Sequence, residues 1–226
     1  MKVLNVLVSR TDRAGDLLLT MPIFRELKTA FPNCRITAHV RKYTASLLKM
    51  CPEVDSIIVD DDFASGLITQ PLINKFKSEN FDVAVLVHPS PRAIMSAFLA
   101  KIPKRIGRAS NLFMPFLNVR KLQHRSKNIK HEFEYNLDLL SGLIKNINLL
   151  PYKIDVFNNI KTLEPKSVVI HPGSGGSAYN IPVQKYVLLA EILVNHKADV
   201  FISLGPGEEH LKEVFDKTLK EKISYI

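Results

Sequence analysis

Short runs of β-branched and aliphatic residues alternate along this chain with segments in which apolar residues recur every three or four positions. Such alternation is typical of an α/β fold, in which a parallel sheet is covered by amphipathic helices. The predicted strands cover Lys2–Ser9, Arg35–Val40, Ser56–Val59, Asp82–His88, Ser167–His171, Asp199–Leu204 and Ile223–Ile226. The predicted helices cover Asp16–Ala30, Ala45–Met50, Leu67–Lys77, Arg92–Lys101, Lys130–Asn146, Val183–Asn195 and Glu208–Leu219.

The alternation is interrupted once, between Leu149 and Pro165, where no periodicity is visible and two prolines occur. We place a linker there, over residues 151–165, between a first domain of residues 1–150 and a second domain of residues 166–226. The second domain would leave an apolar edge strand uncovered at its end. We therefore expect either that another subunit completes this sheet or that the chain is truncated.

Composition excludes several classes of protein. With 46% hydrophobic and 23% charged residues, the chain is neither disordered, nor collagen-like, nor a disulfide scaffold. Its apolar runs are far shorter than the roughly 20 residues that cross a bilayer. Cys34 and Cys51 lack CxxC spacing, so we expect no metal site and a reducing, cytoplasmic compartment. The N-terminal apolar run is interrupted by Asn5, which favours a buried strand over a secretory signal.

The net charge of +9 is confined to one segment, residues 101–130, which holds nine basic residues and no acidic one. These residues are Lys101, Lys104, Arg105, Arg108, Arg120, Lys121, Arg125, Lys127 and Lys130. The segment could face an anionic partner, or it could be a solvated basic face with no dedicated partner. Nucleic-acid binding is disfavoured, because regularly spaced aromatic residues and any known recognition motif are missing from the sequence.

The run Arg13–Asp16 lies between the first predicted strand and the first predicted helix. In open parallel sheets, ligands bind beyond the carboxyl ends of the strands, where a helix N-terminus also presents free N–H groups. Gly15 would allow the tight turn, and Asp16 would present an ionised carboxylate to the ligand. Alternatively, Asp16 caps the helix and has only a structural role.

A second candidate is the loop His171–Ser177, which contains Gly173, Ser174, Gly175 and Gly176 between a strand and a helix. Successive N–H groups in such a loop can cradle phosphate oxygens. The loop matches neither the dinucleotide-binding nor the P-loop pattern, so a simple flexible connection remains the alternative.

Three further groups of residues invite weaker interpretations. Glu208 and Glu209 follow the next predicted strand. We expect them to cap the helix that follows, and the alternative is that one of them contacts a nucleoside. We interpret Asp60–Asp62 as a solvated turn rather than a metal motif. His88 and His171 end strands, and we expect both to be structural.

Several of these segments together resemble the ADP-heptose:lipopolysaccharide heptosyltransferases, glycosyltransferase family 9. The run Arg13–Pro22 resembles the opening of that family, with its Gly-Asp, aliphatic residues, Thr and Pro. The other matching runs are Glu26–Pro32, Asn80–Val85, Arg105–Gly107, Lys130–Tyr135 and the glycine-rich loop His171–Gly176.

The resemblance implies a GT-B-like fold, with two Rossmann-like domains of which the second is incomplete. It implies an inverting transfer of heptose from ADP-heptose to the lipopolysaccharide inner core, with no metal and no cofactor. Asp16 would be the general base. The diphosphate would bind at Gly173, Ser174, Gly175 and Gly176, and Glu208 or Glu209 would contact the nucleoside.

The resemblance also implies partners and a location. The acceptor is an anionic, lipid-linked saccharide, and Arg13, Arg120, Lys121 and Arg125 would face it or the inner face of the inner membrane. We expect a cytoplasmic, peripheral protein that does not bind nucleic acid.

The sequence departs from the family pattern after the glycine-rich loop. Tyr179 and Ile181 stand where the family has lysine and tryptophan, and the later Asp-x-Gly-x-x-His motif does not occur. An inactive remnant, or a binding module of the same family, is therefore the alternative to an enzyme.

Overall fold

The computed structural model describes residues 3–110, 112–127, 129–149, 152, 166–174, 181–205, 207–219 and 222–226. The chain divides into two compact units, Met1–Val156 and Phe157–Ile226, and each is described here by itself.

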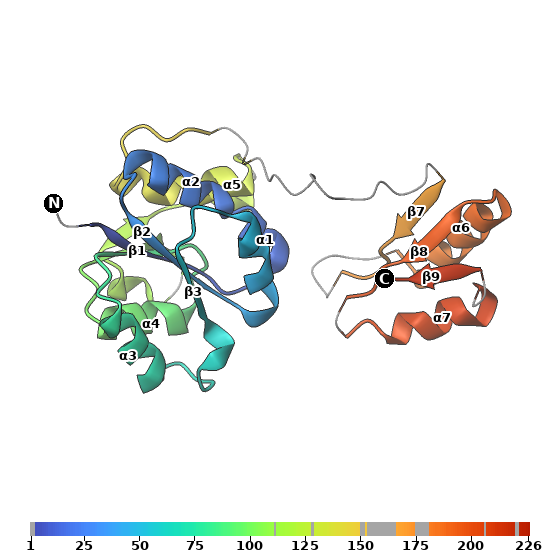
Figure 1. The fold of residues 1–226 in the computed structure, drawn as a ribbon, viewed down its shortest axis with the longest axis horizontal. Coiled ribbons are helices and arrows are strands. Elements are labelled where there is room, and N and C mark those ends of the chain that lie inside the picture. Colours follow the sequence, from blue (N-terminus) through green and yellow to red (C-terminus); the bar gives the residue numbers. More distant parts are fainter. Residues whose placement is uncertain are drawn as a thin grey trace. The chain divides into compact units, whose positions relative to one another are not determined.

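The first unit is built on a six-stranded sheet in which every pair of neighbouring strands is parallel (Figure 1). Its strands are β1 (Asn5–Arg10), β2 (Arg35–Val40), β3 (Ser56–Val59), β4 (Val83–Leu86), β5 (Lys104–Arg108) and β6 (Val119–Lys121). Their spatial order is β3-β2-β1-β4-β5-β6, the order of a doubly wound Rossmann-like sheet. The chain therefore turns to opposite sides after β1 and after β4, and these two strands are neighbours.

Helices cover both faces of this sheet (Figure 1). One core contains buried residues from α1, α2 and α5, and the other contains buried residues from α3 and α4. The bounds of these helices are Ala14–Leu18 for α1, Met21–Ala30 for α2, Gln70–Ser78 for α3, Pro91–Leu99 for α4 and Glu132–Asp138 for α5. Short 3₁₀ helices span Lys42–Met50, Asp60–Asp62, Met114–Phe116, Arg125–Lys127 and Leu139–Gly142.

The single helix predicted over Asp16–Ala30 is wrong, because the structure divides it into α1 and α2. In a continuous helix the ring of Pro22 would meet the carbonyl of Leu18, and the proline has no N–H to donate. The chain instead ends α1 at Leu18 and places Pro22 in the first turn of α2, where a missing N–H carries no penalty.

The long helix predicted over Lys130–Asn146 is also wrong, because α5 ends at Asp138 and a 3₁₀ turn follows. The hydroxyl of Ser141 donates to the carbonyl of Asp138, and the ammonium of Lys104 donates to the carbonyl of Gly142. These side chains satisfy carbonyls that a continuing helix would have bonded, so the helix stops early.

Strands β5 and β6 lie inside the basic segment 101–130, where the sequence analysis placed no strand. Both carry mainly charged residues, with Ile106 and Val119 as their main apolar side chains. Strand β6 is the edge of the sheet, and natural proteins often place lysine and arginine on edge strands. The guanidinium of Arg105 donates to the carbonyls of Phe116 and Ile102, which ties β5 to the 3₁₀ helix Met114–Phe116 and to the segment before β5.

The second unit is a three-stranded parallel sheet with strand order β7-β8-β9 (Figure 1). Its elements are β7 (Ser167–Ile170), α6 (Val183–Asn195), β8 (Asp199–Ile202), α7 (His210–Leu219) and β9 (Ile223–Tyr225). The predicted α/β class is confirmed for both units. The predictions for β2, β3 and α6 have the observed bounds, whereas Glu208 and Glu209 precede α7 instead of opening it.

Candidate active site

The carboxyl ends of β1 and β4 form the switch point of the first sheet, where the connections leave in opposite directions. Ligands of doubly wound proteins bind at such a point, because the diverging loops leave a crevice between them. The loop after β1 carries Asp12 and leads into α1, and the loop after β4 carries His88. The candidate residues near Asp16 therefore lie at the part of the fold best suited to bind a ligand.

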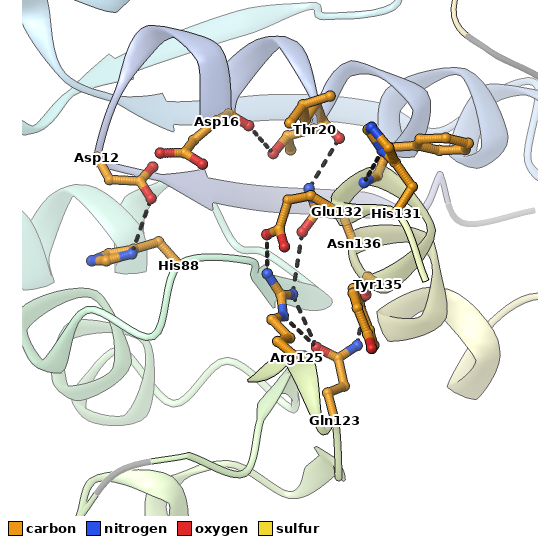
Figure 2. Close-up of polar contacts among 12 residues, drawn as sticks. Asp12, Asp16, Thr20, His88, Gln123, Arg125, His131, Glu132, Tyr135 and Asn136 are labelled. Atoms are coloured by element: carbon orange, nitrogen blue, oxygen red, sulfur yellow. Dashed lines mark hydrogen bonds and ion pairs between the residues drawn. The ribbon is translucent and has the colours of Figure 1, made fainter. Parts of the chain in front are cut away.

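Asp16 lies in the first turn of α1 and does not cap this helix. The N-cap residue is Arg13, which makes no capping bond with its side chain and is exposed. The carboxylate of Asp16 instead forms an ion pair with Arg10, at 2.8 Å from Nη2, and is 32% exposed. The capping interpretation is therefore wrong. Asp16 is an accessible carboxylate that the buried Arg10 holds in place. The carbonyl of Asp16 accepts from the hydroxyl of Thr20 (Figure 2).

A second carboxylate, that of Asp12, shares the same arginine. Its Oδ1 lies 2.7 Å from Nε of Arg10. Its Oδ2 lies 3.2 Å from Nδ1 of His88, a contact shown in Figure 2. Burial acts to raise the pKa of Asp12, but the hydrogen bond to His88 and the charge of Arg10 outweigh it and keep this pKa below its usual value. The sequence analysis did not single out Arg10 or Asp12; their only local signal is their position at the end of a buried strand.

Arg125 approaches the same edge of the sheet from the segment after β6. It is 17% exposed, forms an ion pair with Glu132 of α5, and donates to the side chains of Gln123 and Asn136 (Figure 2). Asn136 in turn donates to the carbonyl of Leu19, at the junction of α1 and α2. Arg125 is thus held inside the unit by the side chains of Gln123, Glu132 and Asn136.

Of the other predicted acceptor-facing or membrane-facing residues, Arg120 and Lys121 lie in the edge strand β6, whereas Arg13 precedes α1. The guanidinium of Arg120 is exposed and donates to the carbonyls of Leu117 and Pro115, and Lys121 is half-buried.

A polar cavity of about 490 Å³ adjoins the switch point and reaches His88. Asp60 lines it and accepts from His39 and pairs with Arg92, so it does not belong to a solvated turn as predicted. Burial acts to raise the pKa of Asp60, but the contacts with His39 and Arg92 lower it below its usual value.

Ser9, His39 and Asp60 form a hydrogen-bonded chain that has the residue types of a hydrolase triad. The hydroxyl of Ser9 lies 2.9 Å from Nδ1 of His39, and Nε2 of His39 lies 3.0 Å from Asp60. Ser9 and His39 are completely buried, so no substrate reaches the hydroxyl. The chain is structural and stiffens one wall of the cavity.

In the second unit, Gly173 and Ser174 follow β7, whereas Gly175 and Gly176 lie outside the described residues. Glu208 is buried, accepts from the backbone N–H of Gly205 at 2.9 Å, and lies against Gly173. A Cβ added at Gly173 would overlap the Glu208 carboxylate, so a larger residue there would require the Glu208 side chain to move.

Glu209, by contrast, is exposed and accepts from the N–H of Gly207. Backbone hydrogen bonds, from its own N–H and that of Gly207, lower the pKa of its carboxyl. Of the two glutamates, Glu208 is therefore the one in contact with the glycine-rich loop.

Among the described residues, no group of three His, Cys, Asp or Glu side chains is arranged to hold a metal ion. In the same part of the chain, no helix is both long and apolar enough to span a membrane.

Comparison with known proteins gives glycosyltransferases among the relatives of this chain. The chain is 29% identical over 223 residues to a protein of Haemophilus influenzae named "Putative glycosyltransferase", covering 90% of this chain and 64% of that protein. It is 28% identical over 107 residues to Lipooligosaccharide heptosyltransferase 2 of the same organism, covering 46% and 31% of the two chains. No family model matches the chain.

Solved structures of the same kind share the fold. The ADP-heptose lipopolysaccharide heptosyltransferase II of Escherichia coli superposes with a TM-score of 0.74 at 16% identity, covering 98% of this chain and 72% of that one. A glycosyltransferase family 9 protein of Veillonella parvula gives 0.76 at 18% identity, with 100% and 70% covered. The heptosyltransferase WaaC of E. coli, solved with ADP-2-deoxy-2-fluoro heptose, gives 0.71 at 15% identity, with 99% and 76% covered. The chain thus has the GT-B-like fold that the resemblance implied, and it spans 64% of the length of its first curated relative.

Proposed function

We propose that this chain, which has the fold of glycosyltransferase family 9 structures and glycosyltransferases among its relatives, transfers a heptose from ADP-heptose to a hydroxyl of the lipopolysaccharide inner core. The observation that carries the proposal is the carboxylate of Asp16. It is exposed at the switch point and oriented by the buried Arg10, in the run of residues that most resembles this family.

Asp16 acts as the general base in this proposal. The acceptor oxygen attacks the anomeric carbon from the face opposite the diphosphate while its proton passes to the Asp16 carboxylate. The bond from the anomeric carbon to the diphosphate oxygen breaks, and ADP leaves with the bonding electrons. The configuration is therefore inverted. Arg10 holds the carboxylate in position, and such proton transfer contributes roughly 10²–10⁴ in rate.

The second unit holds the donor. The N–H groups of Gly173, Ser174, Gly175 and Gly176 bind the diphosphate and stabilise the charge that develops on it, so the proposal needs no metal or cofactor. Glu208 contacts the nucleoside, because it is the glutamate that lies against Gly173. Glu209 is left to stabilise its own turn.

The test is an assay of ADP release from ADP-heptose with Kdo–lipid A as acceptor. We expect release that depends on both substrates and that is lost in Asp16→Asn. If the wild-type chain releases no ADP above background, the proposal that it is an enzyme is rejected.

A second candidate function is a binding module or inactive remnant of the same family. It is favoured by Tyr179 and Ile181, which replace the lysine and tryptophan of the family pattern. Such a protein would bind ADP-heptose or the acceptor in titration calorimetry without releasing ADP.

We also propose that the basic segment contacts an anionic membrane surface, which makes the protein peripheral on the inner face of the inner membrane. Leu112, Leu122 and Ile129 are 91%, 74% and 74% exposed within this segment, among its lysines and arginines. Each basic residue near an anionic surface contributes about 1 kcal/mol to binding. Neutralising Arg120, Lys121 and Lys127 together should reduce sedimentation with anionic liposomes, and unchanged binding would reject the contact.

A further inference from the structure

Two arginines lie in one row across the carboxyl edge of the first sheet. Ser9 of β1 pairs with Leu86 of β4, and Leu86 pairs with Gly107 of β5. One residue further along the chain in each case, Arg10, Val87 and Arg108 lie side by side, and we call these three residues the row. Because neighbouring strands are about 4.8 Å apart, the Cα atoms of Arg10 and Arg108 are separated by about 10 Å.

Both arginines project from the same face of the sheet. Side chains alternate along a strand, so Arg10 shares its face with Val6 and Val8, and Arg108 shares its face with Ile106. These three apolar residues belong to one core, the core that α1, α2 and α5 cover. Arg10 and Arg108 therefore point to the side of the sheet where Asp16 and Arg125 also lie.

The two arginines differ in their partners. Arg10 is paired with Asp12 and Asp16. Arg108 is half-buried, its Nε is buried without a hydrogen-bond partner, and no carboxylate in the described part of the chain forms an ion pair with it. A guanidinium is fully satisfied only when its planar fork meets acceptors, and an oxyanion offers two oxygens in the matching geometry.

Arg125 brings a third guanidinium close to this row. Burial lowers the pKa of Arg125, the charge of Glu132 opposes this change, and the positive charges of Arg108 and Arg10 add to the lowering. Charge is thus divided across the edge of the sheet. Two carboxylates face Arg10 at the β1 side, and the unpaired positive charge of Arg108 lies at the β5 side, next to Arg125.

We propose that Arg108, supported by Arg125, binds an oxyanion of the acceptor, a carboxylate or a phosphate, and thereby fixes the acceptor hydroxyl beside Asp16. This role rests on the proposed function, since it places the acceptor at this edge of the sheet. It makes acceptor charge a condition of recognition: a neutral saccharide of the same shape would bind weakly.

The experiment measures acceptor binding directly, by titration calorimetry of the full chain with Kdo–lipid A in detergent micelles and no donor. We expect Arg108→Gln to weaken binding about 10- to 100-fold, as for the loss of a charged hydrogen-bonded pair, and Arg108→Lys to restore part of it. Arg35→Gln is the matched control, because Arg35 is an exposed arginine at the first position of β2, at the end of the sheet opposite to Arg108. Equal binding by Arg108→Gln and wild type overturns the proposal.

Two modified acceptors identify the source of the oxyanion. Esterifying the carboxylates should abolish the difference between wild type and Arg108→Gln if a carboxylate is bound, and removing the lipid phosphates should do so if a phosphate is bound. A difference that survives both changes overturns the proposal.

Stability provides a readout independent of substrate. Without ligand, Arg108→Met should unfold at the same or a higher temperature than wild type, because a half-buried guanidinium whose Nε is buried without a partner costs free energy. A clear loss of stability would mean that Arg108 has a structural role.

The failure of this inference can be told apart from the failure of the proposed function. If the wild-type chain transfers heptose but Arg108→Gln binds the acceptor as tightly as wild type, the role of Arg108 is rejected and the proposed function stands. If the wild-type chain binds the acidic acceptor through Arg108 but releases no ADP, the proposed transfer is rejected and the role of Arg108 in acceptor binding stands.

Discussion

The Nη2 atom of Arg10 lies 2.8 Å from Oδ1 of Asp16, so the last residue of a buried strand holds a carboxylate in the first turn of the next helix. Arg10 is 5% exposed and Asp16 is 32% exposed, which makes the arginine the fixed partner and the carboxylate the group open to a ligand.

Removing the charge of Asp16 should abolish transfer without unfolding the chain. We expect Asp16→Asn to lower kcat by roughly 10²–10⁴, because an amide cannot accept the acceptor proton. The measurement is ADP release under saturating substrates. Asp62→Asn, at an exposed aspartate, is the control and should retain wild-type activity. If Asp16→Asn retains most of the wild-type activity, another group is the general base.

Asp12 should stabilise the fold above about pH 3.8 and lose this effect in acid. Burial alone would raise its pKa, but the hydrogen bond to His88 and the charge of Arg10 lower it below the value of 3.8 expected for an unfolded chain. A lowered folded-state pKa stabilises the protein above the unfolded pKa, and this stabilisation disappears as pH falls through the folded pKa.

Urea denaturation of Asp12→Asn measures this effect. At pH 7 the variant should be less stable than wild type by roughly 1–3 kcal/mol, and the gap should narrow below about pH 3.8. A gap of constant size across this range contradicts the assignment.

A side chain at Gly173 should destabilise the second unit while Glu208 is present, because the Glu208 carboxylate would have to move. Gly173→Ala forces a Cβ into the Glu208 carboxylate, so we expect a loss of about 1–3 kcal/mol in the unfolding of the second unit. In the Glu208→Ala background the same change should cost at least about 1 kcal/mol less. Gly15→Ala, where a Cβ meets nothing within 4 Å, is the control. Equal costs in both backgrounds would mean that the two residues are not in contact.

Cys51 should resist alkylation while the protein is folded. The residue is 2% exposed, and burial raises the pKa of its thiol to about 12, so almost no thiolate exists at pH 8. Mass spectrometry after iodoacetamide treatment should show alkylated Cys51 only when the chain has been unfolded in urea. Rapid labelling of the folded chain would place this thiol at an accessible position.

The class of the fold could be predicted from the sequence because each strand and helix carries its own periodicity. Arg35–Val40 and Val183–Asn195 were predicted with the observed bounds, since burial of alternate or helically spaced side chains is a local property. The helix predicted over Asp16–Ala30 failed where a local constraint, Pro22, was given too little weight. Strands β5 and β6 were missed because their charged residues hide the alternation.

The sequence by itself determined the α/β alternation, the position of Asp16 after the first strand and the glycine-rich loop after β7. Only the tertiary structure decided what these residues contact. The pairing of Asp16 with Arg10 depends on how α1 returns over the sheet, and the row of Arg10 and Arg108 depends on β4 lying between β1 and β5. The physical reason is that periodicity reports which face of an element is buried, whereas strand order and register decide which distant charges share one edge.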